Sequence, residues 1–260
     1  MGLARFDMGL RGVLHPTTNP LMTPIDAPSP NHDARTVAPD MIVLHYTGME
    51  TGEAALARLR DPAAKVSAHY LIEEDGGLFV LVPEERRAWH AGVSFWAGRN
   101  DINNVSIGIE LVNPGHDWGY RAFPAAQMRT LIGLLDEVRD RWQVPDARIL
   151  GHSDVAPARK LDPGELFDWP GLAAAGHGLW VAADPAPGAP LSIGDEGAGV
   201  FALQAGLARL GYESPPSGHY DPHTATLITA FQRHWRPERI DGVADGETRA
   251  RLVRLSRAAG

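Results

Sequence analysis

One uninterrupted run of apolar residues in the first fifth of the sequence limits the possible folds of this chain more than any other feature. Met41–Leu44 are all apolar and lead into His45, which predicts a buried strand at 41–46. A second strand is predicted at 105–112, where apolar residues alternate with small or polar ones. Two shorter apolar stretches flank the Asp-Gly-Gly turn near residue 76 and predict a hairpin.

Helical patterns alternate with these strands. Residues 124–142 place leucines at helical spacing behind a first-turn proline, and residues 51–59 also have a helical pattern. Strands that alternate with helices predict an α/β fold with a mixed central sheet flanked by helices.

The chain is long enough for two unequal domains. It has 260 residues, and its composition shifts to proline and alanine at 182–190. We expect a first domain at 1–180 that includes an irregular N-terminal segment, a Pro/Ala linker at 181–190, and a small all-α domain at 191–260. A weak internal repeat inside the last segment, with Asp/Gly turns before two helical patterns, supports the all-α prediction.

Composition excludes several classes of function. The net charge is −8 and no basic stripe is present, which argues against a nucleic-acid partner. The chain has no cysteine, so we expect no disulfide, no thiolate metal ligand and no lipoprotein anchor. No apolar run approaches the ~20 residues of a membrane span, and the N-terminus has no signal-peptide core. We therefore expect a cytoplasmic location, with the periplasm or cell envelope as the alternative.

Three potential metal ligands are the strongest chemical signal. His152 and Asp162 lie in a Pro- and Gly-rich segment, and His45 ends the first predicted strand. Two imidazoles and one carboxylate form the ligand set of a catalytic zinc whose fourth position stays open for water. Lys160 precedes Asp162 by two residues, so in an extended segment both side chains point to one side.

An iron site is the alternative assignment. His152 and Asp154 have the His-x-Asp spacing of the facial triad in non-haem iron oxygenases, which takes its second histidine from far downstream. The candidates for that histidine are His177, His219, His223 and His234. Such oxygenases are all-β jelly rolls, whereas a long helix is predicted before this motif, so zinc is favoured.

Glu110 is a candidate base. A carboxylate inside the apolar strand 107–112 is costly unless it has a partner or a task. Water attacking an amide needs a nearby base, and the leaving amine then needs a proton. An outward-facing strand position explains Glu110 equally well from pattern alone.

These motifs together resemble a known family. Residues 40–172 resemble the zinc-dependent N-acetylmuramoyl-L-alanine amidases of the amidase-2 group, of the AmpD and AmiD type. The matching segments, in order, are 44–47, 67–72 with Asp75-Gly76, 88–92, 103–110 and 151–164. The tail resembles a peptidoglycan-binding module at Gly199-Val200, Leu203-Gln204, Leu210-Gly211-Tyr212, Asp221 with Thr224, Phe231-Gln232, and Asp241-Gly242 with Thr248.

The resemblance assigns roles to five residues. It implies that His45, His152 and Asp162 bind Zn2+, that Glu110 is the catalytic carboxylate, and that Lys160 stabilises the oxyanion. The implied reaction is hydrolysis of the amide between the lactyl group of (anhydro-)N-acetylmuramic acid and L-alanine of the stem peptide. The implied partners are muropeptides or peptidoglycan, in peptidoglycan degradation or recycling.

Further residues match family positions near the cleft. His69 and His90 are expected either to contact substrate or to support the structure, and Trp89 and Trp96 either to pack or to stack on sugar. A non-catalytic recognition protein on the same fold is the alternative function, but all five implied site residues are present together, which favours an enzyme. Soluble anhydro-muropeptides and intact sacculi both stay open as substrates, and so do stem-peptide preference and oligomeric state.

Overall fold

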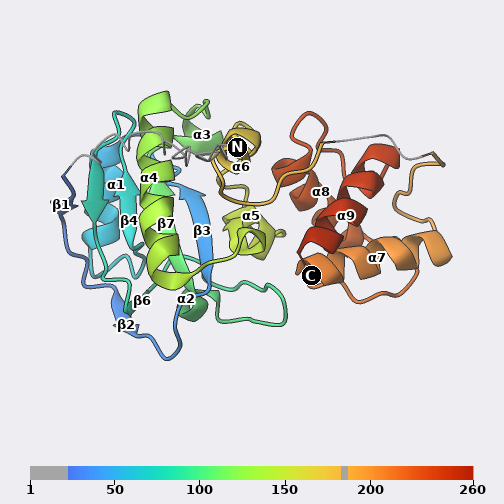
Figure 1. Cartoon of the computed structure of the whole chain (residues 1–260), viewed down its shortest axis with the longest axis horizontal. Coiled ribbons are helices and arrows are strands. Elements are labelled where there is room, and N and C mark those ends of the chain that lie inside the picture. Colours follow the sequence, from blue (N-terminus) through green and yellow to red (C-terminus); the bar gives the residue numbers. More distant parts are fainter. Residues whose placement is uncertain (1–22, 183–186, 260) are drawn as a thin grey trace, which may run out of the picture.

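A mixed six-stranded sheet organises the first part of the chain (Figure 1). The computed structural model describes residues 23–182 and 187–259. The strands lie in the order β1 (Ile25–Asp26), β5 (Leu78–Val80), β4 (Tyr70–Ile72), β7 (Ser106–Leu111), β3 (Met41–Tyr46) and β8 (Ile149–Gly151). Only β4 and β5 pair antiparallel within this sheet, and they form the expected hairpin. The predicted α/β fold with a mixed sheet is confirmed.

Helices cover the sheet, as Figure 1 shows for α4. The long helix α4 (Ala125–Trp142) follows Pro124. Helix α1 (Gly52–Arg60) is capped by Thr51, whose side chain accepts a hydrogen bond from the Ala54 amide. The shorter elements are α2 (Ile102–Val105), α3 (Gly115–Trp118), a 3-10 turn at Asp146–Arg148, α5 (His152–Val155) and α6 (Trp169–Ala174). A separate antiparallel ribbon pairs β2 (His32–Ala34) with β6 (Arg86–Ala88).

The central strand β3 presents different residues to its two faces. Ile42 and Leu44 pack in the same apolar cluster as the leucines of α4, whereas Met41 and Val43 belong to a second cluster. Because side chains alternate along a strand, His45 lies on the face with Val43, away from α4. The face of β3 away from α4 therefore combines the apolar residues of the second cluster with His45 near the end of the strand.

The tail is an all-α unit, as predicted. It consists of α7 (Ala198–Leu210), α8 (Pro222–Trp235) and α9 (Gly246–Ala258). The two halves of the predicted repeat begin α8 and α9 in the same way, because Asp221 and Asp245 each accept a hydrogen bond from the backbone amide three residues later.

Parts of two predicted segments lie outside the described residues. Residues 1–22 belong to the expected irregular N-terminal segment, and residues 183–186 to the expected linker at 181–190. The boundaries of the two domains stay predictions. Within the described part of the chain, no helix has the length and apolar character needed to span a membrane.

The helical unit and the sheet-bearing part share one apolar core. A single cluster of buried side chains contains Val43 and Val155 from the first part together with Leu207 and Phe231 from the tail. Trp96, only 1% exposed, packs edge-on against Tyr212 with 4.8 Å between ring centroids. Of the two roles expected for Trp96, this burial supports packing. The tail is therefore joined to the sheet by a continuous interface as well as by the chain.

Because this core is continuous, we expect both parts to unfold in a single transition. Differential scanning calorimetry of the full chain should give one endotherm, with equal calorimetric and van't Hoff enthalpies. Two separate endotherms would show that the shared cluster does not couple the two parts.

Candidate zinc centre and active site

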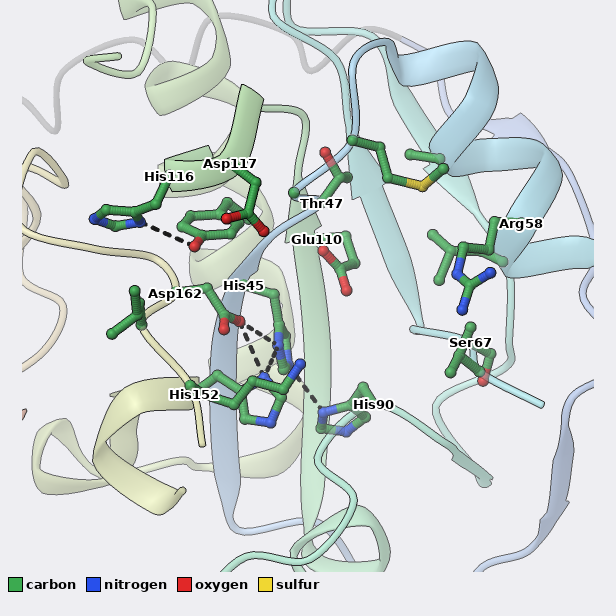
Figure 2. A pocket seen from close by; sticks show the side chains of 18 of the residues that line it. His45, Thr47, Arg58, Ser67, His90, Glu110, His116, Asp117, His152 and Asp162 are labelled. Carbon is green, nitrogen blue, oxygen red and sulfur yellow. Dashed lines mark hydrogen bonds and ion pairs between the residues drawn. The ribbon is translucent and has the colours of Figure 1, made fainter. Parts of the chain in front are cut away.

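Three side chains from distant parts of the sequence converge at the end of β3. His45 Nδ1, His152 Nδ1 and Asp162 Oδ2 lie 3.0 Å from one another in each pairing. Their side chains are almost completely buried, and Figure 2 shows all three pointing to one spot. The strand order explains the meeting, since β3 and β8 are parallel neighbours and His152 directly follows β8.

A hydrogen bond of His152 fixes a ring proton on Nε2, the nitrogen that points away from Asp162. His152 Nε2 lies 3.1 Å from the carbonyl oxygen of Ala91. A carbonyl only accepts, so Nε2 carries the hydrogen and donates it. In the neutral ring Nδ1 then has a free lone pair, and that lone pair faces Asp162.

A longer chain of hydrogen bonds fixes His45 in the same way. The Ser106 hydroxyl donates to the carbonyl of Ile102 at 2.6 Å, so Ser106 Oγ accepts from His90 Nε2 at 3.2 Å. Burial, followed by the neighbouring His45, lowers the pKa of His90 well below its ordinary value, so its ring is neutral. His90 Nδ1 therefore accepts from His45 Nε2 at 3.0 Å, which leaves a lone pair on His45 Nδ1.

The pKa values at this point agree with that proton arrangement. Burial, and then the neighbouring His152, lowers the pKa of His45 to about 4, so the ring is neutral near pH 7. Burial alone would raise the pKa of Asp162, but contacts with His152 and His45 hold it below its usual range. A lone pair of His45 and a carboxylate oxygen of Asp162 thus face each other without a proton between them, with His152 Nδ1 3.0 Å from both, and this arrangement suits a bound cation.

The donor set fits zinc. Atoms bound to one tetrahedral zinc at about 2.0–2.1 Å lie roughly 3.3 Å apart, close to the 3.0 Å spacings observed. The three residues could hold a metal ion. Each histidine also has the outer hydrogen bond that orients metal-binding imidazoles.

The alternative iron triad is wrong. Asp154 Oδ2 accepts from the Gly151 amide and from His234 Nδ1, and Oδ1 accepts from the Tyr212 hydroxyl. Its oxygens are therefore occupied away from the ligand atom of His152. Helix α5 explains this, because it places residues 152 and 154 on different sides of one turn.

Glu110 lies on the neighbouring strand, next to the three candidate ligands. Parallel pairing of β3 with β7 sets Glu110 directly beside His45, and Figure 2 shows it beside the cluster. Burial, reinforced by Asp162, raises the pKa of Glu110 well above its ordinary value, although Lys160 opposes this shift. Glu110 Oε2 is buried without a hydrogen-bond partner among the described residues. A carboxyl group in this position is suited to taking up and releasing a proton.

A cavity of about 420 Å3 opens onto these residues. Its wall includes the three ligands, Glu110 and Lys160, so the structure brings together all five residues that the sequence singled out. Arg58 and Ser67 line the side across from the ligands (Figure 2). The cavity therefore has room for a substrate whose reacting group lies at the ligands and whose remainder extends past Glu110.

The other sequence-predicted residues are placed differently. His69 is fully buried and is absent from the cavity wall; its ring accepts from the Gly108 amide and contacts the Arg35 guanidinium. This supports the structural role among the two expected for it. His90 and Trp89 do line the cavity, and His90 also holds His45.

Ser106, which continues the hydrogen-bond chain beyond His90, was not predicted from the sequence. Its position contained a signal, since Ser106, Gly108 and Glu110 alternate with apolar residues and share the polar face of β7. Arg35 was also missed, and no sequence pattern marks it. Its guanidinium donates to the backbone of several segments around His69.

Comparison with known proteins identifies the family. Residues 35–165 match the N-acetylmuramoyl-L-alanine amidase family, and residues 196–252 match a family of peptidoglycan binding domains. The amidase AmiD of Escherichia coli is 36% identical over 230 residues, which cover 81% of this chain and 79% of AmiD. The chain belongs to the N-acetylmuramoyl-L-alanine amidase family.

Solved structures of relatives extend the match to the whole fold. The complex of E. coli AmiD with anhydro-N-acetylmuramic acid-L-Ala-D-gamma-Glu-L-Lys superposes with a TM-score of 0.72 at 34% identity, covering 87% of this amidase and 92% of that chain. AmpDh3 of Pseudomonas aeruginosa, in complex with an anhydromuramic pentapeptide, gives a TM-score of 0.71 at 30% identity over 95% and 99% of the chains. The 1,6-anhydro-N-acetylmuramyl-L-alanine amidase AmpD of Enterobacter cloacae is 39% identical, over 55% of this amidase and 84% of AmpD.

Replacing Gly108 by alanine tests whether His90 holds His45 in this amidase. A Cβ at position 108 would lie 2.4 Å from the His90 ring, so Gly108→Ala should displace that ring and weaken zinc binding by about 10- to 100-fold. Competition with a chromogenic chelator measures this affinity.

Gly199→Ala is the matched control, because a Cβ there meets nothing closer than 3.8 Å. Its zinc affinity should equal that of the unmodified protein. Unchanged affinity in Gly108→Ala as well would show that the hydrogen bond from His45 to His90 does not set the metal site.

Proposed function

We propose that this protein is a zinc-dependent amidase that cleaves the bond between the lactyl group of (anhydro-)N-acetylmuramic acid and L-alanine of the stem peptide. The observation that carries the proposal is the convergence of His45, His152 and Asp162 at one cavity beside Glu110, whose buried Oε2 has no hydrogen-bond partner within residues 23–182 and 187–259. The complexes of AmiD and AmpDh3 with anhydromuramic peptides, both built on the same fold, support this substrate class.

Each residue would have a defined task in the reaction. His45, His152 and Asp162 would hold zinc, which when bound activates water near neutral pH and polarises a carbonyl oxygen. Glu110 would accept the proton of the attacking water on Oε2 and pass it to the departing nitrogen of L-alanine. The raised pKa of Glu110 suits this second step, because a protonated carboxyl can donate.

Lys160 would stabilise the negative charge that develops on the carbonyl oxygen. It lines the cavity together with Asp162, two residues further on. A donor placed at a developing oxyanion is worth roughly 3 kcal/mol of transition-state stabilisation. The products would be a lactyl carboxylate on the muramic acid and a free stem peptide.

Small anhydro-muropeptides are the proposed substrate, and intact peptidoglycan is the alternative. The bound ligands of AmiD and AmpDh3 are of the small type, and a cytoplasmic location would match such a substrate. The match of residues 196–252 to peptidoglycan binding domains instead favours a polymer in the cell envelope.

Replacing Glu110 by glutamine should separate proton transfer from metal binding. Glu110→Gln keeps the shape of the side chain but cannot accept the proton, so we expect kcat to fall by about 10²–10⁴-fold while the zinc content stays at that of the unmodified protein. Glu137→Gln, an exposed position on α4, serves as control and should leave kcat unchanged. Full activity of Glu110→Gln would exclude it as the proton acceptor.

Removing the metal tests the reaction and its substrate together. The purified full chain is incubated with 1,6-anhydro-muropeptide or with intact sacculi, with and without a chelator, and released L-alanyl peptides are quantified. We expect chelator-sensitive cleavage of the anhydro-muropeptide that returns on addition of zinc. Rapid cleavage of sacculi would assign the polymer instead. No cleavage of either by zinc-loaded protein would leave a peptidoglycan recognition protein.

A further inference from the structure

The buried carboxylate of Asp154 connects the metal site to the helical tail. Asp154 is 1% exposed and lies on α5, two residues after His152. Among the residues that the structure describes, its hydrogen-bond donors are the Gly151 amide at 2.8 Å, the Tyr212 hydroxyl at 2.9 Å and His234 Nδ1 at 2.6 Å. Two of these donors come from the tail, one from the segment after α7 and one from α8.

This carboxylate also shapes the backbone that carries a proposed zinc ligand. By accepting from the Gly151 amide, Asp154 closes the first turn of α5, and that turn sets the direction of His152. The turn is further held by a hydrogen bond from the Ser153 amide to the Asp162 carbonyl. The position of Asp154 therefore determines that of His152, because residues 151–154 form less than two turns of one short, hydrogen-bonded helix segment.

The tail donors have little freedom to move. The His234 ring is stacked between Trp169 of α6 and Trp235 of α8, with ring centroids 3.6 and 3.7 Å away. Tyr212 is buried against Trp96, and the Gly211 carbonyl accepts from the Ala97 amide at 2.7 Å. In Figure 1, α5 lies between β3 and α8, where these contacts meet.

We propose that Tyr212 and His234 of the helical tail are positioning residues of the zinc site, acting through Asp154 on α5 and His152. The tail then does more than attach the enzyme to its substrate: it completes the support of one metal ligand. The expected effect on kcat rests on the proposed function. The expected effect on zinc affinity does not rest on the proposed reaction, because zinc binding can be measured without substrate.

Tyr212→Phe in the full chain is the sharpest test, because it removes one hydroxyl and keeps the ring packed on Trp96. Tyr220→Phe is the matched control: Tyr220 is also buried in the tail, and its hydroxyl donates to the Gly242 carbonyl at 2.8 Å, away from Asp154. Zinc affinity by chelator competition, kcat and KM on 1,6-anhydro-muropeptide, and thermal stability are measured for both variants.

We expect Tyr212→Phe to weaken zinc binding by about 10-fold, the lower end for outer hydrogen bonds of a metal site, and to lower kcat without changing KM. Tyr220→Phe should lose similar thermal stability but keep the zinc affinity and kcat of the unmodified protein. Equal zinc affinity in the two variants would overturn the inference and leave Tyr212 a packing residue.

Variants at position 234 give a second, independent measurement. His234→Asn retains a side-chain N–H that can donate to Asp154, whereas His234→Leu does not. Zinc affinity should therefore fall further in His234→Leu than in His234→Asn, and equal losses would count against the inference. If the expected order of zinc affinities is found but no variant cleaves a muropeptide, the positioning role stands and the proposed reaction fails.

Discussion

The parallel pairing of β3 with β7 on one side and β8 on the other is the constraint on which the site depends. It brings the carboxyl ends of the three strands to one edge of the sheet, where His45, Glu110 and His152 meet. Alternation along β3 then decides that the polar residues face away from α4. A shift of one residue in the register of β3 would point His45 into the apolar core next to α4, and the three side chains would no longer meet.

Neutral histidines joined by directed hydrogen bonds give this edge its chemistry. Each proton in the chain from Ser106 through His90 to His45 has one permitted position, because the chain ends on a backbone carbonyl. Burial removes the alternative of protonated rings. The lone pair that remains on His45 points to the place suited to a cation. Its direction is set by His90 and Ser106, which are not among the candidate ligands.

Sequence reasoning reached the elements and ligands whose signals are local or chemically distinctive. The apolar run before His45 predicts β3, and two imidazoles with a carboxylate predict a metal. Arg35 was not predicted, because an arginine that donates to backbone carbonyls leaves no spacing signal in the sequence. Ser106 does alternate with Gly108 and Glu110, but alternation alone does not tell which polar residue of a strand orients a histidine. The hydrogen bond from His234 to Asp154 was not predicted, because the sequence pattern gives residue types but not the directions of their side chains.

The packing of the tail changes how a long glycan could be handled. A recognition unit on a flexible tether raises local concentration over a range of distances. Here the shared apolar core around Trp96 and Tyr212 holds the helical tail in a fixed position relative to the sheet and its cavity. A glycan strand bound by the helical unit, which matches peptidoglycan binding domains, would reach the cleft at one separation and one angle. On intact peptidoglycan, the alternative substrate, the enzyme would then cut at a fixed distance from the bound segment, and the length of a glycan strand would matter as much as its chemistry.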